Sequence, residues 1–578
     1  MKAKEWFLIA IAVVFIVIQV WLDLRLPDYM SEITILVKTG GTMREIWING
    51  GYMMACAGAS LVTAIIVCWI SAVVGSAFSR RLRSKIFNKV DAFSAGEINK
   101  FSTASLITRS TNDITQVQML VTMAIQILIK SPILAVWAII KISGKGFEWS
   151  VATGVAVSLI MLMITILVII VMPMFKKIQN LNDNINKVAR ENLTGIMVVR
   201  AYNADAYHEE KFDDANKQLA DAHLFTSRAM AFMQPVISFI MMSLPLSIYV
   251  IGAIIINQEA SPIVRLVTFS NMVVFSAYAM QIIMAFIMVA MMFIFIPRAS
   301  VSAKRINEVL NTVPSIKNGT VTEGDANRSG EVVFDHVGFR YPGAQDAILH
   351  DISFTAQKGQ TVAIIGGTGC GKSTLIGLVP RFYDCTSGAI LVDGVNVRDY
   401  TLEALNNKLG YVPQKAVLFT GSVASNVAYG NNGRGDLTMD NVQRAVKIAQ
   451  GKNFVEKMEG QYEAEIARGG ANISGGQKQR LAIARAVCRQ PEIYIFDDSF
   501  SALDFKTDRQ LRSALKSEIS GATCLIVAQR IGTIMDADKI IVLENGKKVG
   551  EGTHKELLGN CKVYKEIALS QLSEEELK

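Results

Sequence analysis

Long apolar runs in the first half of the sequence most constrain how this chain can fold. A membrane span needs roughly 20 mostly apolar residues, and the runs that meet this length are residues 6–26, 52–78, 119–141, 150–174, 229–256 and 267–296. The hydrocarbon core offers no hydrogen-bond partners to the backbone, so such runs cross it as α-helices. The sequence therefore predicts a six-helix, all-α transmembrane domain.

The placement of basic residues supports a membrane protein over a nucleic-acid binder. The formal net charge of +8 would suit either class. However, Lys and Arg gather at the ends of apolar runs, as in SRRLRSKIFNK at residues 79–89, and cytoplasmic loops of membrane proteins carry this excess. We therefore expect membrane lipid and no nucleic acid among the partners. The seven cysteines show neither close pairing nor metal-type spacing, which fits a reducing cytoplasm.

The N-terminus could be mistaken for a secretory signal, because MKAKEW precedes an apolar run. No small-residue cleavage site follows, and the run ends in LDLRLPDY instead. We interpret it as a retained transmembrane helix.

Two polar connections, after the second and the fourth apolar run, are long and keep a helical period. In the later one Ile178, Leu181, Ile185 and Val188 recur at three- and four-residue steps. We expect the flanking spans to extend beyond the membrane as helices and to turn back near residues 95–103 and 202–212. A short helix at each turn could face a partner domain.

The pattern changes after Pro297. A short helix is expected at residues 299–311, and the polar segment SIKNGTVTEGDANRSG is typical of a linker. From Glu331 on, strand-like and helix-like runs alternate, which indicates an α/β domain with a largely parallel sheet. The expected domains are residues 1–312 (transmembrane), 313–330 (linker) and 331–578 (α/β).

A phosphate-binding loop lies in the α/β domain. Its motif follows the apolar strand TVAII, precedes a helix-like run and fits G-x-x-x-x-G-K-[ST]. The loop consists of Gly366, Gly367, Thr368, Gly369, Cys370, Gly371, Lys372, Ser373 and Thr374. We expect backbone N–H groups to hold phosphates, Lys372 to reach the β- and γ-phosphates, and Ser373 to bind Mg²⁺. Asp497, at the end of the strand IYIFD, would complete the magnesium site.

A second anion-binding turn lies in NISGGQKQRLAIARAV, at residues 472–487, where Ser-Gly-Gly opens a helix. A second such turn makes sense if it closes over a nucleotide held by another subunit. With these motifs the chain resembles, over essentially its whole length, the ATP-binding-cassette exporters with a fused membrane domain. The resemblance implies the exporter fold, with ATP and Mg²⁺ as cofactors.

The resemblance also implies roles for single residues. Tyr341 in GFRYPG is similar to the aromatic residue that stacks on adenine, and Gln414 in YVPQ to the glutamine that touches Mg²⁺ and senses the membrane domain. Asp504 ends SALD, which is similar to the loop that crosses the dimer interface. The residues similar to the signature turn are Ser474, Gly475, Gly476 and Gln477, with Ile473 in place of the usual leucine.

Two catalytic positions depart from the family pattern. Asp498 stands where most members have a glutamate that polarises the attacking water, and Gln529 in CLIVAQR stands where a histidine contacts the γ-phosphate. None of the five histidines is near that position; they are His208, His223, His336, His350 and His554. Aspartate is shorter by about 1.5 Å, one C–C bond, and glutamine cannot carry a proton or a positive charge. We expect ATP binding to survive and hydrolysis to be slow.

This pattern resembles the degenerate subunit of bacterial heterodimeric multidrug exporters. The partner would be a second half-transporter with an intact glutamate and histidine, and the cargo drugs or other amphipathic molecules. The resemblance places the protein in a bacterial plasma membrane, with the nucleotide-binding domain in the cytoplasm. The alternatives are a homodimer with two weakened sites, a homodimeric lipid or peptide exporter, and a regulatory or scaffold subunit that binds ATP without transporting.

Polar residues inside the spans are candidates for a substrate cavity, because they are costly in hydrocarbon. They are Gln19, Asp23, Gln126, Lys130, Asn271 and Gln281. Asp23 could instead pair with nearby Arg25. Methionines recur at helical spacing in the sixth run and suit either a promiscuous apolar surface or ordinary helix packing; they are Met280, Met284, Met288, Met291 and Met292.

Overall fold

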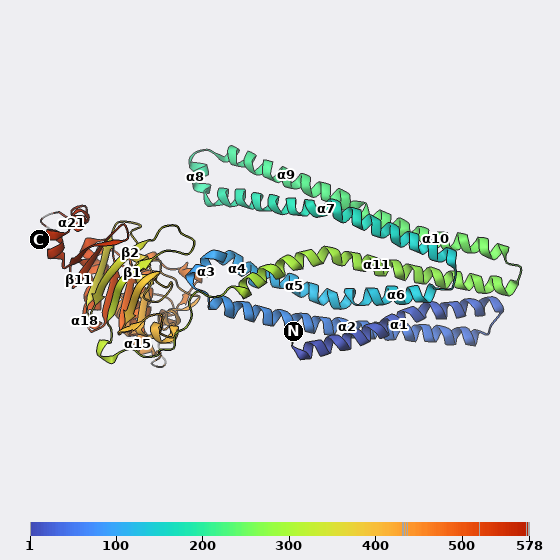
Figure 1. Ribbon diagram of the computed structural model, residues 1–578, viewed down its shortest axis with the longest axis horizontal. Coiled ribbons are helices and arrows are strands. Elements are labelled where there is room, and N and C mark those ends of the chain that lie inside the picture. The colour runs from blue at the N-terminus through green and yellow to red at the C-terminus, as the bar shows by residue number, and fades with distance from the viewer. Residues whose placement is uncertain are drawn as a thin grey trace. The chain divides into compact units, whose positions relative to one another are not determined.

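The computed structural model describes residues 2–430, 433, 435, 437–519, 521–573 and 575, apart from the side chains of Phe293 and Ile294. These residues form two compact units, drawn in Figure 1. The first comprises Met1–Lys89 and Ala104–Thr312, and the second comprises Val90–Thr103 and Val313–Lys578. A short segment from the helical half of the sequence therefore packs with the α/β unit.

The first unit is all-α, as predicted. Its elements are α1 (Ala3–Thr39), α2 (Met43–Asp91), α4 (Thr103–Ser110), α5 (Asn112–Met123), the π-helical turn η1 (Ala124–Leu128), α6 (Lys130–Ile142), α7 (Phe147–Thr194), α8 (Ile196–Ala201), α9 (Asp205–Ala231), α10 (Met233–Gln258) and α11 (Pro262–Asn311). Within the described residues, six helical stretches are long and apolar enough to cross a membrane. Each contains one of the predicted spans, which confirms that prediction.

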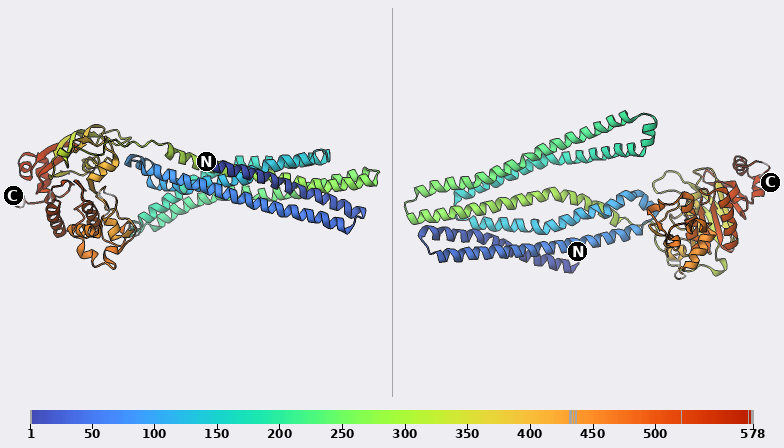
Figure 2. Two further views of the ribbon diagram at one scale, coloured as in Figure 1. Left: turned by 90° about the horizontal axis from the view of Figure 1, so that it is seen from below. Right: turned by 180° about the vertical axis from the view of Figure 1, so that it is seen from behind.

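α11 packs against more helices of this unit than any other described helix. It packs against α1, α5, α6, α7 and α10, and its side chains Phe275, Tyr278 and Ile283 are fully buried. α7 and α9 run side by side as a long hairpin, seen from three directions in Figures 1 and 2. The unit is therefore a bundle of long helices around α11.

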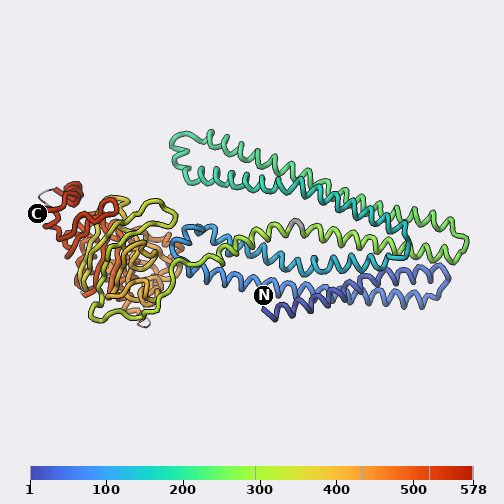
Figure 3. Tube along the Cα trace, viewed as in Figure 1, coloured from blue at the N-terminus to red at the C-terminus, as the bar shows by residue number. Residues whose placement is uncertain are grey.

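The predicted helical extensions are present, with one correction. α2 and α7 both continue well past their apolar runs. The later reversal lies at α8 and the turn at residues 202–204, which overlaps the start of the predicted 202–212. No separate helix begins after Pro297, because α11 runs through that proline to Asn311. Figure 3 traces the long helices of this unit as a tube. Only one backbone N–H is lost at a proline, and the surrounding turns carry the helix on.

The second unit is α/β. Its main sheet has the order β12-β11-β3-β10-β9-β6, in which β11, β3, β10, β9 and β6 are parallel. The strands are β3 (Thr361–Gly366), β6 (Leu409–Val412), β9 (Ile493–Asp497), β10 (Thr523–Val527), β11 (Lys539–Glu544) and β12 (Lys547–Gly552). Both faces of this sheet are buried, because alternate residues of β3 enter different hydrophobic cores. Ala363 and Ile365 enter one core, and Val362 and Ile364 enter the other. Parallel strands covered on both faces need such continuous apolar runs.

A separate antiparallel sheet contains strands that sequence analysis did not distinguish from the parallel ones. It has the order β2-β1-β4-β5, and a small pair β7-β8 lies apart. The strands are β1 (Val332–Phe339), β2 (Leu349–Ala356), β4 (Ser387–Val392), β5 (Val395–Asn396), β7 (Gly421–Ser422) and β8 (Glu465–Ile466). Apolar runs of similar length occur in both sheets, so composition did not separate them.

Short helices complete the α/β unit. They are α3 (Ala95–Phe101), α12 (Lys372–Gly377), α13 (Leu402–Lys408), α14 (Val423–Val427), α15 (Met439–Ile448), α16 (Lys452–Val455), α17 (Gly475–Cys488), α18 (Phe505–Glu518), α19 (Ile531–Ile534), α20 (His554–Asn560) and α21 (Lys562–Leu569), with 3₁₀ turns η2 (Ala326–Arg328), η3 (Gln461–Glu463) and η4 (Arg468–Gly470). The polar segment before β1 packs on this unit: Leu402 N donates to Asn318 Oδ1 over 2.9 Å, and Val321 forms a bridge with Tyr400.

Candidate nucleotide-binding site

The phosphate loop, Asp498 and Gln529 converge because three neighbouring strands end at one edge of the parallel sheet. β10 lies between β3 and β9, and Val527 pairs with both Ile364 and Asp497. The carboxyl ends of parallel strands meet at the same edge, where ligands of α/β proteins bind. The phosphate loop after β3, Asp498 after β9 and Gln529 after β10 therefore lie close together.

The glycines of the loop serve different purposes. A Cβ on Gly366 would lie 2.1 Å from the carbonyl oxygen of Leu543, so packing requires this glycine. Gly371 has φ of +95° and lies against Leu349, a backbone conformation that glycine adopts without strain. Gly367 and Gly369 face open space, and Thr368 between them is exposed. The open side of the loop can therefore accept a phosphate.

Lys372 lies along the loop. Its Nζ donates to the carbonyl oxygens of Gly366 (2.9 Å) and Gly367 (2.8 Å) and lies 3.7 Å from Cys370 Sγ. Neutral carbonyls hold an ammonium group more weakly than phosphate oxygens do. A bound nucleotide can therefore draw Lys372 out of these contacts.

Ser373 and Asp497 form a pair of oxygen donors suited to Mg²⁺. Ser373 Oγ donates to Asp497 Oδ1 over 2.7 Å, and Asp497 is buried. Burial raises the pKa of the Asp497 carboxyl, and the Ser373 bond opposes that rise. Among the described residues no group of three or more His, Cys, Asp and Glu could hold a metal. Mg²⁺ usually binds through one or two carboxylates together with substrate phosphates, and this donor set fits that mode.

Asp498 is held by two amide side chains. Gln529 Nε2 donates to Asp498 Oδ2 over 2.8 Å, and Gln414 Nε2 donates to the same oxygen over 3.3 Å. The backbone of Asp498 is left-handed, with φ of 45°, and its N–H donates to Val527 O. Asp498 and Gln529, the two residues that depart from the family pattern, are thus hydrogen-bonded to each other.

Tyr341 lies beside the phosphate loop, where its hydroxyl is 2.9 Å from Thr374 Oγ1. Its ring is edge-on to Phe339 and Tyr383, with centroid distances of 4.8 and 5.2 Å. Sequence reasoning did not single out Tyr383 or Tyr411. Burial, followed by the charge of Asp497, raises the pKa of Tyr411. Tyr411 is the first residue of the YVPQ motif that contains Gln414. Its position in that motif could have marked it as a residue of the site.

The signature turn is exposed at Ser474 and Gly475. Ser474 is the N-cap of α17, where its Oγ accepts from Gln477 N and its own N–H donates to Gln477 Oε1. A Cβ on Gly475 would meet nothing within 4 Å, whereas one on Gly476 would lie 3.3 Å from Ala502 O. Nearby, Asp504 caps α18 by accepting from Thr507 N. Among the described contacts, none joins this turn to the chain's own phosphate loop.

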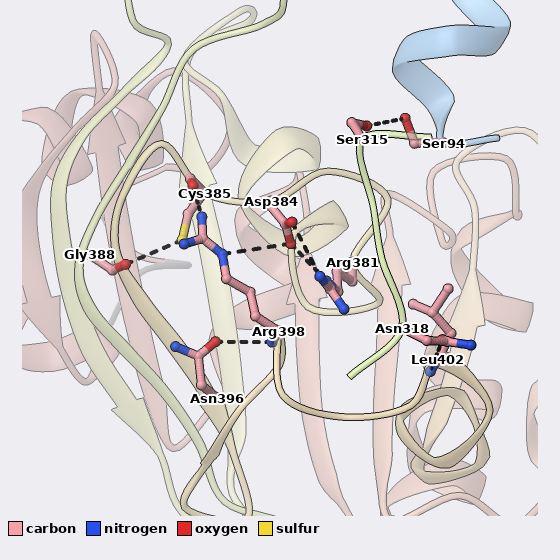
Figure 4. A network of polar contacts seen from close by, with 10 residues as sticks. All are labelled: Ser94, Ser315, Asn318, Arg381, Asp384, Cys385, Gly388, Asn396, Arg398 and Leu402. Carbon is pink, nitrogen blue, oxygen red and sulfur yellow. Dashed lines mark hydrogen bonds and ion pairs between the residues drawn. The ribbon is translucent and has the colours of Figure 1, made fainter. Parts of the chain in front are cut away.

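The short helix α3 contacts the α/β core within the second unit. Ser94 caps it and, as Figure 4 shows, lies beside Ser315, with 3.0 Å between the two hydroxyls. Glu97 accepts from the N–H groups of both serines. At the other end, Asn99 Nδ2 donates to the Tyr383 hydroxyl over 3.2 Å. Tyr383 touches the Tyr341 ring, so α3 is linked to the phosphate loop through two aromatic residues.

The loop that carries Tyr383 is itself braced by charged groups. Arg381 Nε donates to Asp384 Oδ1 over 2.7 Å, and Arg398 donates to the carbonyl of Cys385 while lying 3.8 Å from Asp384, as Figure 4 shows. These bonds fix the backbone on both sides of Tyr383.

This fold and site define an ATP-driven membrane transporter. The family models for the ABC transporter transmembrane region and the ABC transporter match residues 9–286 and 349–501. The chain belongs to the ABC transporters and is an exporter half-transporter, a multi-pass membrane protein with fused transmembrane and ATP-binding parts.

Relatives and a solved structure extend over nearly the whole chain. It is 37% identical to an uncharacterized ABC transporter ATP-binding protein of Mycobacterium tuberculosis, over 98% of this chain and 96% of that protein. It is 31% identical to an ATP-dependent lipid A-core flippase of Pseudomonas aeruginosa, over 86% and 80%. A bacterial Atm1-family ABC exporter with ATP bound has the same fold, with a TM-score of 0.80 at 24% identity, covering 99% of this chain and 100% of that one.

Proposed function

We propose that this chain is the hydrolytically impaired half of a heterodimeric exporter. It would move drugs or other amphipathic molecules out across a bacterial plasma membrane, with its nucleotide-binding domain in the cytoplasm. The observation that carries this proposal is the pairing of Asp498 with Gln529 at the end of the parallel strands. The domain division at residues 1–312, 313–330 and 331–578 is part of the same proposal.

Binding of Mg²⁺–ATP should be intact. Lys372 and the open glycine loop would hold the phosphates, and Ser373 with Asp497 would hold Mg²⁺. Tyr341, fixed by its hydroxyl and by two aromatic neighbours, would stack on the adenine. When bound, Mg²⁺ neutralises phosphate charge, which is the chemistry that such an ion supplies to phosphoryl transfer.

Hydrolysis at this site should be slow for two reasons. The carboxylate of Asp498 ends about 1.5 Å short of where a glutamate would reach, and the same oxygen accepts from two amides. These two hydrogen bonds hold the carboxylate against the amides. Gln529 brings an amide where a titratable imidazole would act, so no second base replaces it.

The exposed turn at Ser474–Gln477 supports a two-chain arrangement. The Ser474 hydroxyl and N–H are joined to Gln477 in a capping box, and Gly475 leaves the approach to the turn open. In a partner with an intact glutamate and histidine, this turn would complete a working site. The partner's turn would in return close over the slow site of this chain.

Nucleotide-driven movement would reach the membrane helices through α3. This helix follows α2 directly in the chain and is bound to Ser315 and Tyr383. A shift of Tyr341 on nucleotide binding would therefore displace Tyr383 and, through it, α3. Gln414, which bonds to Asp498, offers a second route from the same site.

A homodimeric lipid exporter is the second candidate function. The similarity to proteins named lipid A-core flippases favours it over a peptide exporter or an ATP-binding scaffold subunit. Such a homodimer would hold two sites with Asp498 and Gln529, and both should hydrolyse slowly.

The test is to purify this chain alone and together with a half-exporter that carries glutamate and histidine at the two positions. We expect ATP binding but little hydrolysis by the chain alone, and brisk hydrolysis by the pair. Trapped ADP should accumulate on the phosphate loop of the partner. Brisk turnover by the isolated chain would contradict the proposal, and ATP-dependent dye uptake into vesicles that Lys372→Ala abolishes would exclude a pure scaffold.

A further inference from the structure

Two ion pairs join α1 to α6 inside the helical unit. Asp23 pairs with Lys130 at 3.2 Å, and Asp28 pairs with Lys141 at 2.8 Å. Asp23 and Lys130 belong to apolar runs that can span a membrane, where charged groups are costly and usually functional. Arg25 is not the partner of Asp23 and lies over the ring of Trp21 instead.

The two sides of these pairs are held differently. Asp23 Oδ1 accepts from Ser60 Oγ over 2.5 Å, and Asp28 Oδ1 lies 2.6 Å from the buried Tyr278 hydroxyl. Asp23 therefore keeps a hydroxyl donor if its lysine leaves, whereas the single Tyr278 proton is shared between Asp28 Oδ1 and Leu24 O, which lies 2.8 Å from the hydroxyl. For both lysine ammonium groups, the described residues provide the paired aspartate and no other acceptor. The lysines are the members of the pairs that can change partner.

Both members of each pair are partly exposed on the helical unit. The exposed fractions are 22% for Lys130 and 25% for Asp23, and 32% for Lys141 and 24% for Asp28. The pairs lie on the same two helices, and five residues separate Asp23 from Asp28, about 7.5 Å along α1. An anion could thus meet the two ammonium groups in succession.

The backbone and polar neighbours around the deeper pair are unusual for plain helix packing. The π-helical turn η1 ends just before Lys130, and π-bulges in helices are frequent at functional sites. Ser131 Oγ and Gln281 Oε1 are buried and find no hydrogen-bond partner among the described residues, although Gln281 Nε2 donates to Asp23 O. Buried polar atoms without partners are rare in proteins; here one belongs to Gln281, which bonds to the backbone of Asp23, and one to Ser131, which follows Lys130 in the chain.

We propose that the α1–α6 pairs form the site that takes the anionic group of the transported amphiphile. A phosphate or carboxylate replaces Asp23 as the partner of Lys130, and a second exchange at Lys141 follows. A cationic group is disfavoured, because it would have to compete with both a lysine and a hydroxyl for each aspartate. This inference rests on the proposed exporter function and assigns a charge to its substrate.

The competing role for these pairs is to hold α1 and α6 together. In that case removing either partner should have similar effects, since a buried charge without its partner is destabilising whichever member remains. An anion site predicts an asymmetry, because the lysine contacts the substrate and the aspartate only competes with it.

The experiment uses the assembled exporter in proteoliposomes with Mg²⁺–ATP. The probes are fluorescent phosphatidylglycerol, fluorescent phosphatidylcholine, the soluble anion calcein and the cation ethidium. The variants are Lys130→Gln, Lys141→Gln, Asp23→Asn and the charge swap Asp23→Lys with Lys130→Asp. Lys217→Gln on the exposed face of α9 is the matched control for the loss of one lysine charge.

We expect ATP-dependent movement of an anionic probe, with KM raised about tenfold by Lys130→Gln, the scale of one charged hydrogen bond. Asp23→Asn should leave KM unchanged or lower it, Lys217→Gln should have no effect, and the charge swap should fold without restoring transport. Movement of phosphatidylglycerol would identify a lipid headgroup as the source of the anion. Movement of calcein would identify a soluble amphiphile as that source.

Transport of ethidium in preference to the anions would overturn the anion site while leaving the exporter function standing. Equal effects of Lys130→Gln and Asp23→Asn, with rescue by the swap, would assign the pairs to helix packing. If no probe moves with ATP, the proposed exporter function fails together with this site.

Discussion

Repair of the two altered positions should turn the site that we propose to be slow into a working one. The change is Asp498→Glu combined with Gln529→His. The longer arm carries the carboxylate forward by about 1.5 Å, and a misplacement of about 1 Å in a reacting group can cost on the order of 100-fold. We therefore expect hydrolysis at this site to rise about 100-fold, which is about 2.7 kcal/mol in the barrier.

Both changes are needed because of the bond between the two side chains. In the native protein, Gln529 Nε2 is 2.8 Å from the carboxylate it restrains. Asp498→Glu alone leaves this amide donor, so its gain should be smaller than that of the double variant. The effects of the single changes should thus be non-additive, as expected for residues in direct contact.

The assay is single-turnover hydrolysis of radiolabelled ATP by the complex, with the partner's own site inactivated so that this site is measured alone. Adding Lys372→Ala to the repaired chain should abolish the gain and serves as the control. An unchanged rate in the double variant, with ATP affinity preserved, would refute the claim that these two residues limit hydrolysis.

The remaining predictions concern the signature turn and α3. Gly475→Ala should leave the fold intact, because the added Cβ meets nothing within 4 Å in this chain. It should nevertheless lower ATPase of the two-chain complex several-fold by crowding the partner's nucleotide, and unchanged ATPase would contradict the two-chain site. Tyr383→Phe and Asn99→Ala each remove the 3.2 Å bond between α3 and the aromatic pair. Both should lower the substrate-stimulated part of ATPase several-fold while basal ATPase and ATP affinity stay unchanged, and a matching loss of basal activity would instead indicate a damaged nucleotide site.

The helical half shows how much of the structure can be predicted from short stretches of sequence. Apolar length alone located the membrane helices, because a bilayer imposes the same requirement on every span. The phosphate loop is a local prediction of the same kind, since its glycines, lysine and serine lie within one short segment. Pro297 shows the limit: it suggested a break in the chain, but α11 continues through it, because neighbouring turns decide whether a helix survives one proline.

The sequence by itself determined the two-part organisation, the spans, the nucleotide motifs and the unusual pair Asp498 and Gln529. Only the tertiary structure decided that Gln529 bonds to Asp498, that Tyr383 joins α3 to Tyr341, and that Asp23 pairs with Lys130 and not with Arg25. Motifs and apolar runs are local in the chain and can be recognised from spacing. Each of these contacts joins residues far apart in sequence, and which side chains meet across that distance is fixed by how the strands and helices pack.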